Sequence, residues 1–154
     1  MASLNAFLVA VELAERQRDE ARQALQDARN ARQAAQQQLD QIESYAQETQ
    51  NRWGLRADAA VKPEVMYHHY QFMDRLAYAS GLQSSVVGDQ AGRVDAAAQV
   101  LLQAELRVTS LKKVVEKRKR EMEHLQSRRD QKQTDERASL QFRSAGSGPS
   151  GQEF

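Results

Sequence analysis

The chain has 154 residues, a net charge of +1 at pH 7, no cysteine, and only seven glycines and two prolines. Ala, Gln, Arg, Glu and Leu dominate, a composition typical of long helices and coiled coils that argues against a globular domain with a thick core. The lack of cysteine excludes disulfides and thiolate chemistry and fits a reducing cytoplasm. No stretch reaches the ~20 apolar residues of a membrane span, and Leu4–Leu13 lacks the basic start and cleavage site of a signal peptide.

The first predicted element is a helix over residues 3–53. Ser3 is expected to cap it by accepting a hydrogen bond from a first-turn N–H. Gly54 is expected to end it, because glycine readily adopts the left-handed conformation at a helix end. Its apolar residues follow the 3-4 spacing of a coiled-coil seam, in which a and d side chains pack as knobs into holes. The a positions are Leu4, Val11, Leu25, Leu39, Ala46 and Trp53, and the d positions are Phe7, Ala14, Ala21, Ala28, Ala35 and Ile42.

Two arginines, Arg18 and Arg32, occupy a positions of this first seam. Either they bind buried carboxylates, or their stems lie along the seam while the guanidinium groups reach water. We favour the second interpretation, because the sequence identifies no buried carboxylate partner. Polar a residues and the many alanines at d positions predict a coiled coil of modest stability.

A second helix is predicted over residues 63–142, after a linker over residues 54–62. Pro63 suits the first turn, where its missing N–H costs nothing, and Glu64 suits the positive end of the helix dipole. This helix has a seam of its own. Its a positions include Met66, Met73, Val87, Val94, Leu101, Val108, Val115 and Met122, and its d positions include Leu76, Ala97, Ala104, Leu111 and Leu125.

Three glycines, Gly81, Gly88 and Gly92, weaken the middle of the second helix. Each costs roughly 1 kcal/mol relative to alanine in a helix interior. Because the heptad register continues through them, we expect a softened or bent helix, and a true break is the alternative. The segment 144–154 has no apolar periodicity and is predicted to be disordered.

A short linker between two long helices favours an antiparallel hairpin. The predicted fold class is therefore all-α, with two long helices in an antiparallel coiled-coil hairpin over residues 1–143. If the turn is centred near residue 59, the numbers of opposed residues add up to about 118. The second helix is then the longer one and overhangs the first beyond about residue 118. The seam stops after Leu125, as expected for a helix that has no partner within its own chain.

Nothing in the sequence resembles a catalytic or metal site. His68 and His69 are adjacent, so on a helix they point about 100° apart and form no metal pair, and His124 is distant in sequence. Solvated or partly seam-packed histidines explain all three. There is no Gly-rich phosphate loop and no Ser or Cys nucleophile motif. We therefore predict a protein that is not an enzyme and has no catalytic residue, cofactor or metal.

Residues 107–137 form a basic block, in which eleven Lys or Arg against six Asp or Glu leave a net charge of +5. One interpretation is a solvated helix face with i,i+4 pairs such as Glu116–Arg120. A second is nucleic-acid binding through counterion release, although a bZIP protein places its basic region N-terminal to the zipper and not after it. A third is docking onto an acidic protein surface.

Near the turn, two stripes with 4-3-4 spacing are expected to lie side by side along one edge of the seam. The first helix contributes Gln38, Ile42, Tyr45 and Thr49, and the second contributes Phe72, Leu76, Ala79 and Gln83. They concentrate aromatic residues in a chain that has few. They either widen the seam or form a protein-binding patch, and the sequence favours neither.

Three segments carry a resemblance to the FliJ family, small cytoplasmic proteins of the flagellar type III export apparatus. They are Gln38-Leu39 through Tyr45, Tyr70-Gln71-Phe72 through Leu76, and Arg129-Asp130-Gln131-Lys132 followed by Asp135-Glu136, the most distinctive of the three. The length and the hairpin layout match along nearly the whole chain. The glycines of the second helix, and residues Thr49 and Gln83 in place of larger or histidine-like ones, depart from the family pattern.

The resemblance implies a non-catalytic stalk, similar to the central stalk of rotary ATPases. Its implied partners are a hexameric export ATPase, an export gate protein of the inner membrane, and export chaperones. The implied location is the cytoplasm, at the inner membrane under the flagellum. The implied export-gate site is Gln38, Ile42, Tyr45, Phe72, Leu76 and Ala79. The implied ATPase-ring site is Arg128, Arg129, Asp130, Lys132, Asp135 and Glu136. The alternatives are the equivalent stalk of a virulence secretion system, and a nucleic-acid-binding coiled coil that uses residues 107–137.

Overall fold

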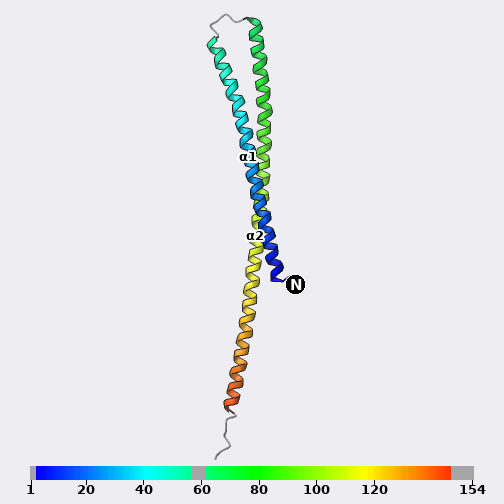
Figure 1. The fold of residues 1–154 in the computed structure, drawn as a ribbon, viewed down its shortest axis with the longest axis vertical. Helices are drawn as coiled ribbons and strands as arrows, with labels where there is room; N and C mark the ends of the chain where they lie inside the picture. The colour runs from blue at the N-terminus through cyan, green and yellow to red at the C-terminus, as the bar shows by residue number, and fades with distance from the viewer. Residues whose placement is uncertain (1–2, 57–61, 147–154) are drawn as a thin grey trace, which may run out of the picture. The chain divides into compact units, whose positions relative to one another are not determined.

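The computed structural model describes residues 3–56 and 62–146, and these residues form two α-helices and no strand. Helix α1 is Leu4–Arg56 and helix α2 is Pro63–Gly146. The helices pack against each other as an antiparallel hairpin, which confirms the predicted all-α fold class (Figure 1).

Both helices begin with the backbone geometry that the sequence predicts. The Ser3 Oγ accepts a hydrogen bond from the Ala6 N–H at 3.2 Å, so Ser3 caps α1. At the start of α2, the Lys62 carbonyl accepts from the N–H groups of Val65 and Met66 at 3.0 and 3.2 Å. Pro63 occupies the first turn, where it has no N–H to leave unsatisfied.

The helix ends differ from the sequence-based expectations. Helix α1 continues through Gly54 to Arg56, and no described residue has a positive φ, so Gly54 does not end the helix in a left-handed conformation. A glycine inside a helix costs only about 1 kcal/mol relative to alanine, so one glycine does not have to end a helix. Helix α2 runs to Gly146, four residues past the expected end at 142. The rest of the predicted linker and of the predicted disordered tail, residues 57–61 and 147–154, lies outside the described residues.

Residues 14–106 form one compact unit, in which α1 and α2 run side by side (Figure 1). Three contacts fix the register. Gln83 bonds to the Ala35 carbonyl, the Tyr45 ring meets the Phe72 ring, and the Trp53 ring stacks on the His69 ring. The residue numbers of these pairs add up to between 117 and 122. The sequence predicted about 118, which agrees with the observed register.

The core of this unit is a narrow apolar stripe along the predicted seam. The buried apolar side chains are Ala14, Ala21, Leu25, Ala35, Leu39 and Val94, all at predicted a or d positions. Arg18 supports the snorkelling interpretation, because its side chain is only 20% exposed while its guanidinium group pairs with the exposed Asp19 carboxylate at 3.1 Å. Arg32 is exposed. No large side chain in the described residues is fully buried, so each contributes less than the ~1.5–3 kcal/mol of full burial.

Helix α2 passes through Gly81, Gly88 and Gly92 without interruption, so the alternative of a break is wrong. A Cβ atom built on any of the three would meet no atom within 4 Å. Packing within the hairpin therefore does not require glycine at these positions.

Residues 3–13 and 107–146 belong to a second unit. In it Val108 and Val115 are buried, and the Arg118 guanidinium lies over the Phe7 ring at 5.6 Å from its centroid. From Lys119 to Gly146 every residue is exposed, including Met122 and Leu125. The predicted overhang past residue 118 is confirmed, since Arg118 is the last residue of α2 that is not exposed.

Candidate functional site

A shallow pocket of about 360 Å³ lies on one edge of the seam near the turn. Its lining consists of Gln38, Gln41, Ile42 and Tyr45 from α1, and Leu76 and Gln83 from α2. Four of the six residues of the predicted export-gate site are among them, so the structure brings the two stripes together as expected. The half-buried Ile42 and Leu76 supply the apolar part of the pocket, and the glutamine amides supply donors and acceptors around it.

Tyr45 and Phe72 form an aromatic ledge beside this pocket. Their ring centroids are 5.8 Å apart and the rings are nearly perpendicular, at 88°. Tyr45 is 51% exposed and Phe72 is 37% exposed. Both rings thus remain partly exposed along the edge of the seam, as expected if the stripes form a protein-binding patch. An edge-to-face pair contributes about 0.5–1.5 kcal/mol beyond burial, so the two rings hold each other in place at the surface.

Gln83 fixes one wall of the pocket. Its side-chain amide donates to the Ala35 carbonyl at 2.9 Å and to the Gln38 Oε1 at 3.1 Å. This clamp joins α2 to α1 and orients the Gln38 side chain. Ala79 is half-buried and is not part of the lining. Thr49 is half-buried and does not line the pocket, and its hydroxyl donates to the Tyr45 carbonyl at 2.8 Å.

Sequence reasoning did not single out Gln41. It lies three residues after Gln38 and four before Tyr45, so the i, i+3 and i+4 neighbours of a helix face could have identified it. The clamp made by Gln83 could not have been found in this way. It depends on which of several rotamers a long side chain adopts across the seam.

His69 occupies a d position and is buried against Trp53, with ring centroids 4.1 Å apart and an angle of 28° between the rings. Its Nδ1 atom has no hydrogen-bond partner. The seam-packed interpretation is therefore correct for this histidine. No three His, Cys, Asp or Glu residues of the described ranges are grouped so that they could hold a metal ion.

The predicted ATPase-ring residues all lie on the exposed part of α2, from Lys119 to Gly146, in the second unit. The six residues are Arg128, Arg129, Asp130, Lys132, Asp135 and Glu136, and every one is exposed. Asp130 accepts from the Gln126 amide through its carboxylate, at 3.2 Å, and from the Thr134 hydroxyl through its carbonyl, at 2.9 Å. The structure thus places these residues on one helical segment with no packing partner among residues 3–56 and 62–146.

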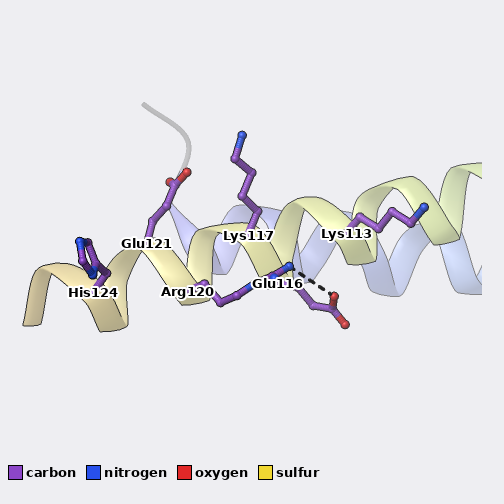
Figure 2. A pocket seen from close by; sticks show the side chains of 6 residues that line it. All are labelled: Lys113, Glu116, Lys117, Arg120, Glu121 and His124. Carbon is purple, nitrogen blue, oxygen red and sulfur yellow. Dashed lines mark ion pairs between the residues drawn. The ribbon is translucent and has the colours of Figure 1, made fainter. Parts of the chain in front are cut away.

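The basic block contains a charged groove along α2, which Figure 2 shows from close by. It has a volume of about 670 Å³ and is lined by Lys113, Glu116, Lys117, Arg120, Glu121 and His124. Glu116 and Arg120 form the predicted i,i+4 ion pair at 4.0 Å. Both side chains are largely exposed, so the pair is worth only about 0.3–0.5 kcal/mol. Two carboxylates lie among the three Lys and Arg side chains of this groove, so it is not a uniformly basic surface.

No helix within the described ranges combines the length and the apolar character needed to cross a membrane. Comparison with curated proteins gives no sequence match. Among solved structures, the chain is similar to a protein described as a YscO homolog from Chlamydia trachomatis. The similarity covers 94% of each chain, with a TM-score of 0.69 and 18% identity, and it shows a shared fold. The family model described as flagellar FliJ protein matches residues 5–147, which include nearly all of both helices. The chain therefore belongs to the flagellar FliJ protein family.

Proposed function

We propose that this chain is a non-catalytic stalk and adaptor of the flagellar type III protein export apparatus. In this proposal it promotes the assembly and activity of the export ATPase ring. It links that ring to the membrane export gate and to export chaperones, and it acts in the cytoplasm at the inner membrane. Family membership supports a role as a component of the export apparatus.

The observation that carries the stalk role is the difference in burial between two parts of helix α2. Helix α2 has buried seam residues as far as Val115, yet every residue from Lys119 to Gly146 is exposed. Most of the stability of a helix in a protein comes from packing its apolar face. A segment without such a face is therefore only marginally stable as an isolated helix in water. Such a segment is suited to insertion between the subunits of a partner. A stalk with unequal faces in a ring of identical subunits cannot contact all of them alike, so it favours particular subunit conformations by differential contact.

Charge reversal tests the ATPase-ring site. The triple variant Arg128→Glu, Arg129→Glu and Lys132→Glu should lose most of the stimulation of ATP hydrolysis that the unchanged chain gives when mixed with its export ATPase. The matched control is Arg29→Glu, Arg52→Glu and Arg75→Glu, which makes the same change in net charge at three exposed positions of the hairpin. Absence of stimulation at every ratio of the two proteins would sink the stalk mechanism. Full stimulation by the triple variant would show that the site is wrong.

Aromatic truncation tests the export-gate site. The variant Tyr45→Ala/Phe72→Ala removes the exposed ledge but no buried seam residue. We expect gate binding at least about tenfold weaker, a loss of about 1.4 kcal/mol, with nearly unchanged helical ellipticity. Tyr67→Ala/Phe142→Ala is the control, since it removes one exposed tyrosine and one exposed phenylalanine elsewhere on α2. A large loss of ellipticity in the first variant, or equal binding by both, contradicts the assignment.

The second candidate is the equivalent stalk of a virulence secretion system, which the similarity to a YscO homolog favours. The same stimulation assay separates the two, if the flagellar and the virulence ATPase of one organism are compared. The nucleic-acid alternative is weakened by the carboxylates Glu116 and Glu121, which lie among the cations of the groove of Figure 2. A salt-dependent gel shift with residues 107–137 intact would restore it.

A further inference from the structure

The seam is more open near the turn than farther along α1. Between residues 14 and 39, five apolar seam residues of α1 are buried. Over residues 42–49 of α1 and 73–80 of α2, every seam residue is only half-buried. Ala46 and Ser80 hold a positions in this stretch, so the space that a leucine would fill there stays open.

A groove of about 420 Å³ opens from this part of the seam. It is lined by residues at e positions, such as Glu43, whereas the pocket beside the aromatic ledge is lined by g residues. Because e and g positions flank the seam on opposite sides, the groove and the pocket lie on opposite edges of the hairpin. We call this one the e-edge groove. Its apolar lining comes from both helices and consists of Ala46, Met73, Leu76 and Ala77.

The charges beside the e-edge groove are all negative. The b positions lie next to the e positions on the same side of each helix. Over residues 40–50 and 70–81, the e and b positions carry Asp40, Glu43 and Asp74 but no Lys or Arg. All three carboxylates are exposed, and none forms an ion pair with a described residue. The arginines nearest in sequence are at g and c positions, on the other side of their helices. The groove thus combines an apolar lining with a negative rim that no cation neutralises.

We propose that the e-edge groove binds an α-helix of a partner protein that carries a row of apolar side chains with Lys or Arg beside it. The cations pair with Asp40, Glu43 and Asp74, and such electrostatic complementarity selects the partner and fixes its register. The apolar side chains enter the space beside Ala46 and Ala77 as knobs, as in a three-helix coiled coil. A helix fits better than an extended segment, because both walls are helices whose backbone groups bond internally and offer no sheet edge.

Two synthetic helical peptides test the proposal with the full chain. Both span about four heptads with leucine at a and d positions, and one has lysine at e and g positions where the other has glutamine. Fluorescence anisotropy should give the lysine peptide a Kd of about 1–100 µM, with binding of the glutamine peptide at least about tenfold weaker. The net charge of the chain is +1, so its overall charge does not favour the lysine peptide. Equal affinity for the two peptides, or no binding of either, overturns the proposal.

Neutralising the rim tests the three carboxylates. The variant Asp40→Asn/Glu43→Gln/Asp74→Asn should bind the lysine peptide about tenfold more weakly or worse. Asp27→Asn/Glu48→Gln/Asp89→Asn is the control, since it makes the same change in charge at three exposed c positions. In each set, one aspartate accepts a hydrogen bond from a glutamine four residues earlier. Equal weakening by both sets, or none by the first, overturns the assignment to this edge.

Filling the groove tests its apolar part. Ala77→Gln puts a longer side chain at an exposed lining position, so helical ellipticity should be kept, while the lysine peptide should bind about tenfold more weakly. Ala98→Gln is the control, at an exposed e position farther along α2. Undiminished binding by Ala77→Gln overturns the proposal, because the peptide then binds elsewhere. None of the changed residues belongs to either site of the proposed function, so gate binding and ATPase stimulation should persist in these variants, and failure of this proposal leaves that function unaffected.

Discussion

At the scale of single residues, His69 is the least satisfied member of the seam. It is buried at a d position, where leucine packs best in a coiled coil, and its Nδ1 atom lacks a partner. An unsatisfied buried polar atom costs about 1–3 kcal/mol. The stack on Trp53 returns part of that free energy. The unpaired nitrogen destabilises the hairpin and the stack on Trp53 stabilises it. Because the cost of the unpaired nitrogen is the larger of the two, an apolar replacement of His69 should stabilise the hairpin.

We therefore expect His69→Leu to raise the free energy of unfolding by about 1 kcal/mol. Urea unfolding followed by helical ellipticity is the measurement. His69→Ala serves as the control, since it also removes the unsatisfied nitrogen but leaves a cavity, and it should destabilise the hairpin. If His69→Leu destabilises as well, the stack on Trp53 contributes more than the unpaired nitrogen costs. The sequence could not decide this, because heptad spacing places His69 in the seam but does not give the orientation of its ring.

At the scale of the helix, the position where the seam ends was predictable and the position where α1 ends was not. The antiparallel register predicted that α2 would be unpaired beyond about residue 118, and every described residue after Arg118 is exposed. That prediction held because heptad register is a property of many residues together. The end of α1 depended on Gly54 alone, and a single glycine can equally well stay inside a helix at modest cost.

Shortening one side chain before and one after Arg118 measures where α2 stops packing against α1. Val115 is 7% exposed, whereas Leu125, at a later position of the same predicted seam, is 55% exposed. We expect Val115→Ala to lower the free energy of unfolding by about 1–2 kcal/mol and Leu125→Ala by less than about 0.5 kcal/mol, although leucine loses more atoms. Chemical denaturation of both variants under identical conditions compares them. Equal destabilisation would mean that the seam continues past Arg118 in solution.

At the scale of the whole molecule, the two candidate surfaces belong to different units of the chain. The pocket proposed to bind the gate lies within residues 14–106, and the exposed segment from Lys119 to Gly146 belongs to the unit that contains residues 107–146. The heptad register predicted which stripes lie side by side and where α2 becomes unpaired, and the family resemblance implied that these two places are binding sites. The sequence did not predict the Gln83 clamp or the exposure of the Tyr45–Phe72 ledge, which depend on side-chain rotamers.

A chain that ends at Arg118 should separate the two activities. Every residue that it removes is exposed or outside the described ranges, so the midpoint of urea unfolding should change little. Gate binding should persist, because the pocket and its clamp remain. Stimulation of the export ATPase should disappear, because the segment proposed to enter the ring is gone. Isothermal titration with the gate protein and an ATP hydrolysis assay measure the two. Loss of gate binding in a fully folded truncated chain would show that the gate also contacts the overhang, and retained stimulation would place the ATPase contact within the hairpin.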